Sequence, residues 1–151
     1  MLSLRKTMLL LMVFLCTYAG ANAQQNSAKP QLFAAYPATL SISETTLQKI
    51  FDLEGNQDAV IDFGSNLVFP CKVIKNEAKY SNLQTVIIRS NAFNNSMMQV
   101  SKVINEDRSI TYTGRIINEK AADGYEIKQS GRGVYQLRKF ETDKILEGCF
   151  L

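Results

Sequence analysis

The chain has 151 residues, 46% of them hydrophobic, and carries 17 basic against 14 acidic side chains, a formal net charge of +3. That is enough chain for one domain with a buried core. Histidine is absent, which excludes a His-based triad, a Cys–His dyad and a His-ligated metal within the chain itself.

The first 23 residues have the pattern of a secretory signal peptide. Arg5 and Lys6 supply the basic start, residues 8–16 are apolar, and residues 21–23 (Ala-Asn-Ala) form a small-x-small cleavage signal. The apolar run is shorter than the ~20 residues of a membrane span, although an uncleaved anchor or a buried N-terminal helix is the alternative. We therefore expect export to the periplasm or the exterior, with a mature chain that begins at Gln24.

Cleavage at this signal changes the charge balance. Removing residues 1–23 leaves 128 residues and takes away Arg5 and Lys6 but no acid, so the net charge falls from +3 to +1. A balanced domain gives no reason to propose nucleic acid as a partner. Cys16 follows Leu15 rather than a small residue, which argues against lipid attachment there.

Two cysteines remain after cleavage, Cys71 and Cys149. In an oxidising compartment this pair predicts a disulfide, which would close a loop of about 80 residues and stabilise the fold by ~4 kcal/mol in the chain-entropy model. Two buried free thiols are the alternative, and sequence separation does not decide between them.

The mature chain begins with a polar stretch, residues 24–30, which predicts a flexible tether before a single domain over residues 31–151. An amphipathic helix is expected over residues 43–54. Ser41 and Glu44 have capping-box spacing, with Ser43 as an alternative N-cap, and Gly55 is expected to end the helix as a left-handed C-cap. Its apolar stripe comprises Leu47, Ile50 and Phe51.

Alternating or β-branched runs fill the rest of the chain. They cover residues 59–63, 67–74, 83–89, 97–104, 109–118, 125–128 and 134–140. The gaps at 91–96, 105–108 and 129–133 are short and polar, as in hairpins. The pattern predicts a mainly β, α+β fold in which one N-terminal helix packs on an antiparallel meander of six or seven strands. An all-β sandwich or half-barrel is the alternative.

Three local features refine this prediction. Cys71 falls on the more apolar face of its strand, and Pro70 beside it cannot donate a ladder hydrogen bond, so that strand is expected at an edge or at a bulge. Gly114 suits a bend or bulge. Residues 141–146 are expected to form a brief turn of helix.

Candidate catalytic groups are few. Ser101 and Lys102 are neighbours that point to opposite faces of a strand, and no S-x-x-K motif follows the leader. An enzyme based on carboxylates would need several side chains to converge in one pocket, drawn from Asp58, Asp62, Tyr112, Tyr125 and Glu126. We therefore predict a protein that is not an enzyme.

Metal and phosphate sites are also poorly supported. Asn56, Asp58 and Asp62 lack the ligand alternation of an EF-hand, and Glu106 with Asp107 fits a hairpin tip. The Gly-rich residues 130–133 precede a strand rather than a helix, so a turn is favoured over a phosphate loop. No cofactor and no metal are expected.

Basic and aromatic residues are interleaved along the predicted strands, and such side chains are favoured in protein interfaces. They form a candidate binding face for a protein, a peptide or an anionic glycan, and core tyrosines beside a solvated sheet face are the alternative. The candidate residues are Arg89, Tyr112, Arg115, Tyr125, Tyr135 and Arg138. Residues 94–96 (Asn-Asn-Ser) also form a glycosylation sequon.

Three segments carry a resemblance. Residues 81–89, 112–118 and 123–127 resemble parts of small uncharacterised secreted proteins of bacteria, and they are loosely similar to the β-rich pro-segments of some secreted proteases. The resemblance implies export and a compact β domain, and it transfers no active-site residue. We expect an exported, non-enzymatic binding domain of the cell envelope or exterior, with a protease inhibitor or pro-segment-like protein, or less favourably a carboxylate-dependent hydrolase, as alternatives.

Overall fold

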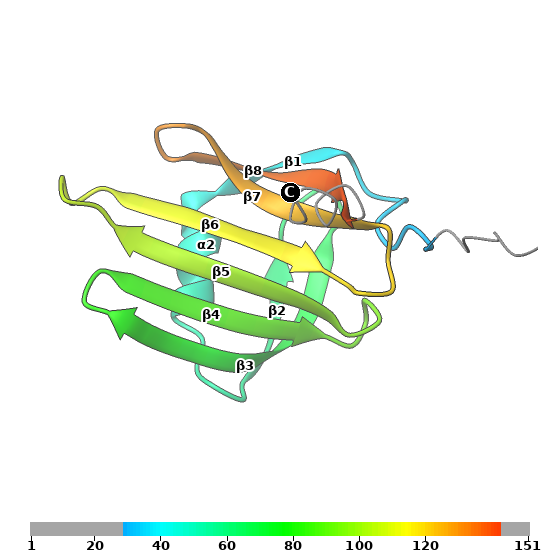
Figure 1. Ribbon diagram of the computed structural model, residues 1–151, viewed down its shortest axis with the longest axis horizontal. Coiled ribbons are helices and arrows are strands. Elements are labelled where there is room, and N and C mark those ends of the chain that lie inside the picture. The colour runs from blue at the N-terminus through cyan, green and yellow to red at the C-terminus, as the bar shows by residue number, and fades with distance from the viewer. Residues whose placement is uncertain (1–28, 143–151) are drawn as a thin grey trace, which may run out of the picture.

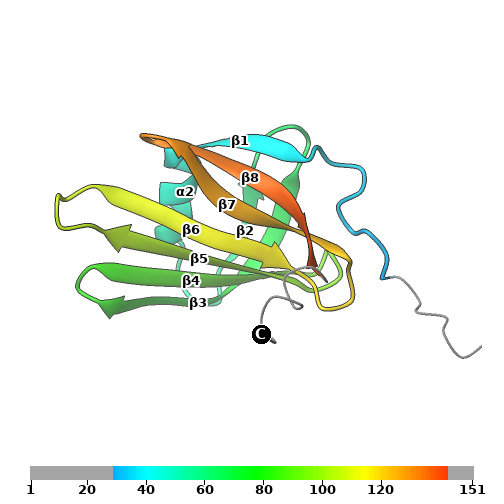
Figure 2. The ribbon, with the colours of Figure 1, turned by 45° about the horizontal axis from the view of Figure 1, so that its top comes forward.

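A curled antiparallel sheet wraps around one short helix in the computed structural model, which describes residues 29–142. The elements are β1 (Thr39–Ser43), α2 (Glu44–Phe51), β2 (Asp58–Asp62), β3 (Val68–Tyr80), β4 (Leu83–Ser90), β5 (Ser96–Ile104), β6 (Ile110–Ile117), β7 (Asp123–Gly131) and β8 (Val134–Glu141). The sheet order is β1-β8-β7-β6-β5-β4-β3-β2, so β1 and β2 form its two edges. Figures 1 and 2 show the sheet as a half-barrel with α2 on its inner side.

The predicted helix is present but shorter. Ser43 is its N-cap and accepts a hydrogen bond from the backbone N–H of Thr46 at 3.0 Å. The helix ends at Asp52, whose backbone stays right-handed, so the prediction of Gly55 as a left-handed C-cap is wrong. The capping box that starts at Ser41 is also wrong, because Ser41 belongs to β1. The predicted stripe of Leu47, Ile50 and Phe51 is buried, as expected.

All seven predicted strand runs are strands, and the sheet gains an eighth, β1. The count of six or seven strands is therefore wrong by one edge strand, and the half-barrel given as the alternative describes the curled sheet. β3 extends to Tyr80 and β7 begins at Asp123, beyond the predicted limits. These extensions are mostly exposed or glycine-containing, so their apolar alternation is weak in the sequence.

Pro70 does not mark an edge, because β3 pairs with both β2 and β4. Nor does it lie at a bulge, since the register of β3 against β4 shifts near Ile74 and Lys79 instead. The hydrogen bond from Val73 N–H to Gln57 C=O shows which residues of β3 direct their backbone groups toward β2. Because this direction alternates along a strand, the nitrogen of Pro70 points away from β2. Pairing with β4 starts only at Lys72. The missing N–H of Pro70 therefore removes no hydrogen bond between neighbouring strands.

Gly114 has continuous register on both sides, so the predicted bulge there is wrong. A Cβ at this position would collide with the carbonyl oxygen of Gln99 and would lie 3.1 Å from the side chain of Ile127. The glycine is needed because neighbouring strands approach closely on the inner face.

The inner face of the sheet and α2 enclose one hydrophobic core. The ring of Phe93 stacks against those of Phe33 and Phe69, with centroid distances of 5.5 and 5.2 Å. At the helix, Tyr112 packs against Phe51 and Tyr135 at 5.7 and 5.4 Å. Aromatic contacts of this kind add to the burial of apolar area.

The segment before β1 is fastened over one end of this core. The buried carboxylate of Asp123 accepts hydrogen bonds from the backbone N–H groups of Leu32 at 2.6 Å and Phe33 at 3.0 Å. Lys139 Nζ donates to the carbonyl oxygens of Phe33 and Tyr36 at 2.6 and 2.8 Å. We call residues 30–38 the N-terminal strap.

Several predictions concern residues that the structure does not describe. They are the leader, the tether up to residue 28, Cys149 and the tail beyond Thr142. Among residues 29–142, no helix is long and apolar enough to cross a membrane.

Candidate functional site

The interleaved tyrosines and arginines lie on opposite faces of the sheet. Alternation along β6, β7 and β8 turns Tyr112, Tyr125 and Tyr135 inward, where each is at most 1% exposed. The same alternation turns Arg115 and Arg138 outward, and both are exposed. The six residues predicted to share one face are therefore divided between the core and the outer surface.

The three tyrosines have structural partners. The hydroxyl of Tyr112 donates to Gln48 Oε1 at 2.7 Å, and that of Tyr125 donates to the carbonyl oxygen of Pro37 at 2.6 Å. Burial raises the pKa of the Tyr125 hydroxyl to about 12, with a smaller contribution from Asp123. Burial likewise raises the pKa of Tyr112 and Tyr135. These hydroxyls stay protonated at neutral pH and serve the fold.

Tyr135 replaces a missing stretch of backbone ladder. β6 pairs with β7 only from Gly114 to Ile116, and Figure 1 shows β7 and β8 rising away from the first half of β6. In that opening the Tyr135 hydroxyl accepts from Tyr112 N–H at 3.3 Å and donates to the Ile110 carbonyl at 3.2 Å. Side-chain bonds thus satisfy polar backbone groups that no strand reaches.

Arginines stand on the outer face in cross-strand register. Arg115 lies opposite Glu126, which lies opposite Arg138 on the next strand. Arg89 lies opposite Met97, and its Nε approaches the Met97 sulfur at 3.4 Å. The guanidinium of Arg115 lies 6.0 Å from the ring centroid of Phe140.

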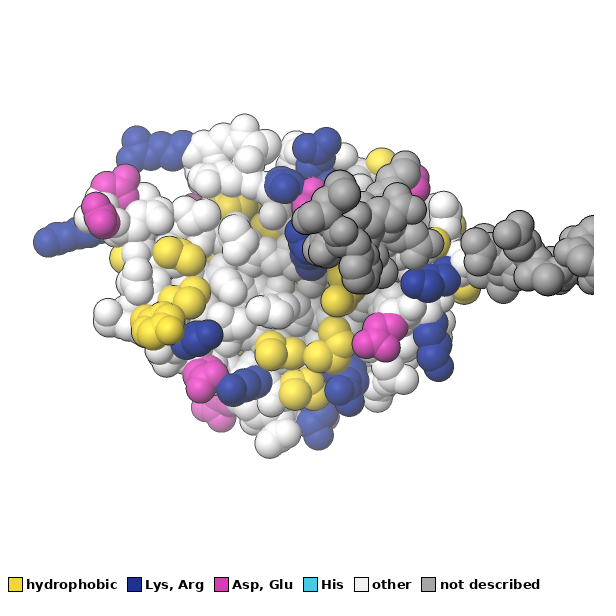
Figure 3. All heavy atoms as spheres, in the orientation of Figure 1, with side chains coloured by type: hydrophobic (Ala, Val, Ile, Leu, Met, Phe, Trp, Pro, Cys, Tyr) yellow, Lys and Arg dark blue, Asp and Glu magenta, His cyan; other side chains and the backbone are white. Residues whose placement is uncertain are grey.

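Four apolar side chains lie among these cations, on β4, β5, β6 and β8. We call them the outer patch: Ile87, Met97, Ile117 and Phe140. Ile117 is 43% exposed, and the other three are half-buried. Figure 3 shows hydrophobic side chains gathered on this face, bordered by Lys and Arg. Surface isoleucines are common singly, whereas a cluster framed by arginine is typical of interfaces.

Three hollows adjoin at the outer patch. The largest, about 710 Å³, lies where β6 and β7 diverge and includes Ile87, Gln99 and Glu126 in its lining. Hollows of about 300 and 370 Å³ lie toward Asn94 and toward Phe140. Ile117 lines all three hollows, so it lies at the point where they meet.

The outer face carries cations that form no ion pair with the described residues. Among the described residues, Lys75 pairs with Glu77 at 2.6 Å and Lys128 with Glu126 at 3.3 Å. In that part of the chain, no carboxylate lies within ion-pair distance of four further cations. These four are Lys72, Arg89, Arg115 and Arg138. The small net charge of the whole chain, +3, is therefore unevenly distributed, and this face is basic.

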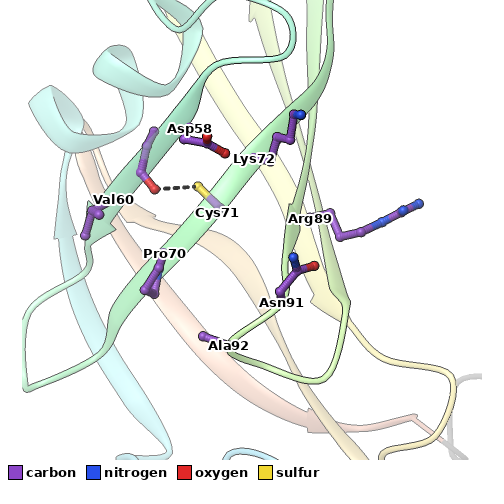
Figure 4. Close-up of a pocket in the computed structure, with 9 residues that line it drawn as sticks. Asp58, Val60, Pro70, Cys71, Lys72, Arg89, Asn91 and Ala92 are labelled. Atoms are coloured by element: carbon purple, nitrogen blue, oxygen red, sulfur yellow. Dashed lines mark hydrogen bonds between the residues drawn. The ribbon is translucent and has the colours of Figure 1, made fainter.

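A further hollow of about 520 Å³ lies beside Cys71, between β2, β3 and the turn after β4 (Figure 4). The Cys71 thiol is 8% exposed and donates to the Ala59 carbonyl at 3.5 Å. Burial, and then the charge of Asp58, raise its pKa to about 11. Cys71 is a free, protonated thiol here, which is a poor nucleophile, and its disulfide with Cys149 remains a prediction.

The candidate carboxylates do not converge. Asp58 lines the hollow beside Cys71, and Glu126 lines the one between β6 and β7, five strands away. Asp62 accepts from Gly64 N–H in a turn at 2.8 Å. Asp107 accepts from the side chain and backbone of Ser109, which lower its pKa. Residues 29–142 contain no group of three His, Cys, Asp or Glu side chains placed to hold a metal ion.

Other predicted motifs have local structural roles. Residues 130–133 form the β7–β8 hairpin, with Gly133 at φ +70°. In the sequon, Asn94 and Asn95 adopt left-handed conformations in the turn before β5, and Ser96 is buried. No protein-family model matches the chain, and no curated protein or solved structure shows significant similarity to it.

The sequence interpretation missed the outer patch. A signal was present, because residues 86–88 and 116–117 are apolar at consecutive positions. Strands with one solvated face alternate, so consecutive isoleucines indicate that both faces carry apolar side chains.

Proposed function

We propose that this protein is an exported, non-enzymatic binding domain that docks an acidic partner protein on the outer face of β4 to β8. The observation that carries the proposal is the outer patch, set among cations that form no ion pair within residues 29–142. The apolar cluster supplies burial on docking, while Arg89, Arg115 and Arg138 select a negatively charged surface.

Export rests on the leader pattern of residues 1–23, and the absence of catalysis rests on the missing histidine and the separated carboxylates. An inhibitor-like role drew its support from Pro70 in an edge strand, and that support is gone because β3 lies inside the sheet. A protein partner is favoured over a glycan because the exposed centre of the site is aliphatic rather than a platform of tyrosines.

The test is affinity capture from the native envelope fraction or culture fluid with three baits. The first is the wild-type protein, and the second carries Arg89→Glu, Arg115→Glu and Arg138→Glu. The third carries Lys79→Glu, Arg108→Glu and Arg132→Glu at exposed strand ends and turns, which changes the net charge equally.

We expect the wild type and the third bait to retain one acidic protein, and the second bait to lose it. Purified partner should bind the wild type with an affinity that falls as salt rises. Equal retention by all three baits, or loss by the second and third alike, would overturn the assignment of the outer face.

A further inference from the structure

The two edges of the sheet differ in what they offer to another chain. In the described sheet β2 pairs only with β3. Gln57, just before β2, accepts a hydrogen bond from Val73 N–H. Because backbone direction alternates along a strand, Ala59 and Ile61 are the β2 residues whose N–H and C=O groups face β3. The N–H and C=O groups of Asp58, Val60 and Asp62 therefore point to the open side. No other strand of the described sheet pairs there.

The side chains of this edge form an apolar centre between two acids. Val60 is 66% exposed, the largest value among the exposed large hydrophobic residues in the described part of the chain. It stands opposite Pro70 and near Val68, which is 43% exposed. Asp58 and Asp62 lie two positions to either side and share its face. Figure 4 shows Val60, Pro70 and Asp58 around the hollow beside Cys71.

β1 lacks these features. Its outward residues are Thr39, Ser41 and Ser43, which are uncharged and small. Ser43 also serves as the N-cap of α2, so the strand passes directly into the helix. Of the two edges of the sheet that the structure describes, only β2 joins open backbone groups to an exposed apolar side chain.

We propose that β2 is a strand-addition site for an extended peptide segment of another protein, with basic, apolar and basic side chains at alternate positions. Backbone hydrogen bonds to Asp58, Val60 and Asp62 supply the pairing, as in other cases of β-augmentation. The apolar residue lies against Val60 and Pro70 and reaches the hollow of about 520 Å³. The basic residues face Asp58 and Asp62 across the strands.

The charges of β2 disfavour a second copy of the chain as occupant. In an antiparallel pair of two β2 strands centred on Val60, Asp58 of each copy would face Asp62 of the other. Like charges directly opposite one another destabilise a strand pair. Acids on an edge strand thus prevent self-association while they attract a basic segment.

Two short synthetic peptides test the site. Both have threonine at most positions and a central valine, and they differ only in having Lys or Glu two positions to each side of it. We expect the Lys peptide to bind about tenfold more tightly than the Glu peptide. On binding, hydrogen exchange of the amides of Asp58, Val60 and Asp62 should slow, and that of the β1 amides should not.

Substitutions in β2 show whether peptide binding depends on this edge. Asp58→Lys with Asp62→Lys should reverse the preference to the Glu peptide, a result that unfolding cannot produce. Val60→Pro removes one outward N–H and no β2–β3 bond, so it should abolish binding while the matched Ser41→Pro on β1 preserves it. Equal affinity for both peptides, or unchanged exchange at β2, would overturn the proposal. Arg115→Glu with Arg138→Glu should leave peptide binding unchanged, which keeps this test independent of the proposed outer-face function.

Discussion

The inner and outer faces of β6 to β8 are built from alternate residues of the same strands, yet they differ in whether their polar side chains have partners. Inside, every buried side-chain nitrogen and oxygen of the described residues has a hydrogen-bond partner. Outside, Arg115 and Arg138 stand beside apolar side chains without an ion-pair partner among the residues that the structure describes. Full satisfaction indicates a role in the fold, whereas unmatched charge indicates a surface available to a partner.

The largest expected effect tests the inner face at the N-terminal strap. Asp123→Ala leaves the N–H groups of Leu32 and Phe33 without an acceptor, so we expect the free energy of unfolding to fall by about 3 kcal/mol. Urea denaturation measures the loss. Asp123→Asn keeps one acceptor oxygen and should lose less; an Ala variant as stable as the wild type would show that the strap is not held by Asp123.

Cys71 gives the next largest effect. A pKa near 11 against the usual 9.0 leaves roughly a hundredfold less thiolate at pH 8, so iodoacetamide should react about a hundredfold more slowly with the folded than with the unfolded protein. A protein of residues 24–151 with Cys149→Ser isolates this thiol. Because burial raises its pKa, the thiol's contribution to stability is present below pH 9 and is lost as the pH rises toward 11. Fast labelling at pH 8 would contradict its burial.

Tyr135→Phe tests the opening between β6 and β7. Loss of the hydroxyl leaves Ile110 C=O and Tyr112 N–H without their partner, so we expect a loss of about 1 to 2 kcal/mol by thermal or urea unfolding. Tyr80→Phe is the matched control, since Tyr80 is 62% exposed and should lose nothing measurable. A difference near zero would mean that water serves those backbone groups equally well.

The smallest effect belongs to the outer face. Arg138→Gln should change the free energy of unfolding by less than about 0.5 kcal/mol, because the side chain is exposed and makes no ion pair in residues 29–142. The same denaturation assay measures it. A loss comparable to that of Tyr135→Phe would assign Arg138 to the fold and remove one argument for docking.

The helix and seven strands were predictable because their apolar periodicity reports burial directly. Leu47, Ile50 and Phe51 have helical spacing, and Phe69, Cys71 and Val73 alternate. β1 was missed because Leu40 and Ile42 are only two apolar residues, and the strand depends on β8 for its pairing. Tertiary pairing of this kind leaves little local signal.

The candidate face was half predictable. Sequence alternation places Tyr112 and Arg115 on opposite faces, but interleaving alone does not say which of the two faces is buried. The outer patch depends on register across four strands, which brings Met97 opposite Ile117 and Arg89. Such register is a property of the assembled sheet and not of any one segment.

The pairing of β1 with β8 affects the rate at which the sheet folds. Their paired residues are between 91 and 99 positions apart, from Ser43 with Val134 to Thr39 with Arg138. Contacts of such long range slow folding, because the entropy cost of closing the loop precedes the stabilising contacts between the strands. The sheet therefore stays incomplete until almost the whole domain has emerged from the ribosome.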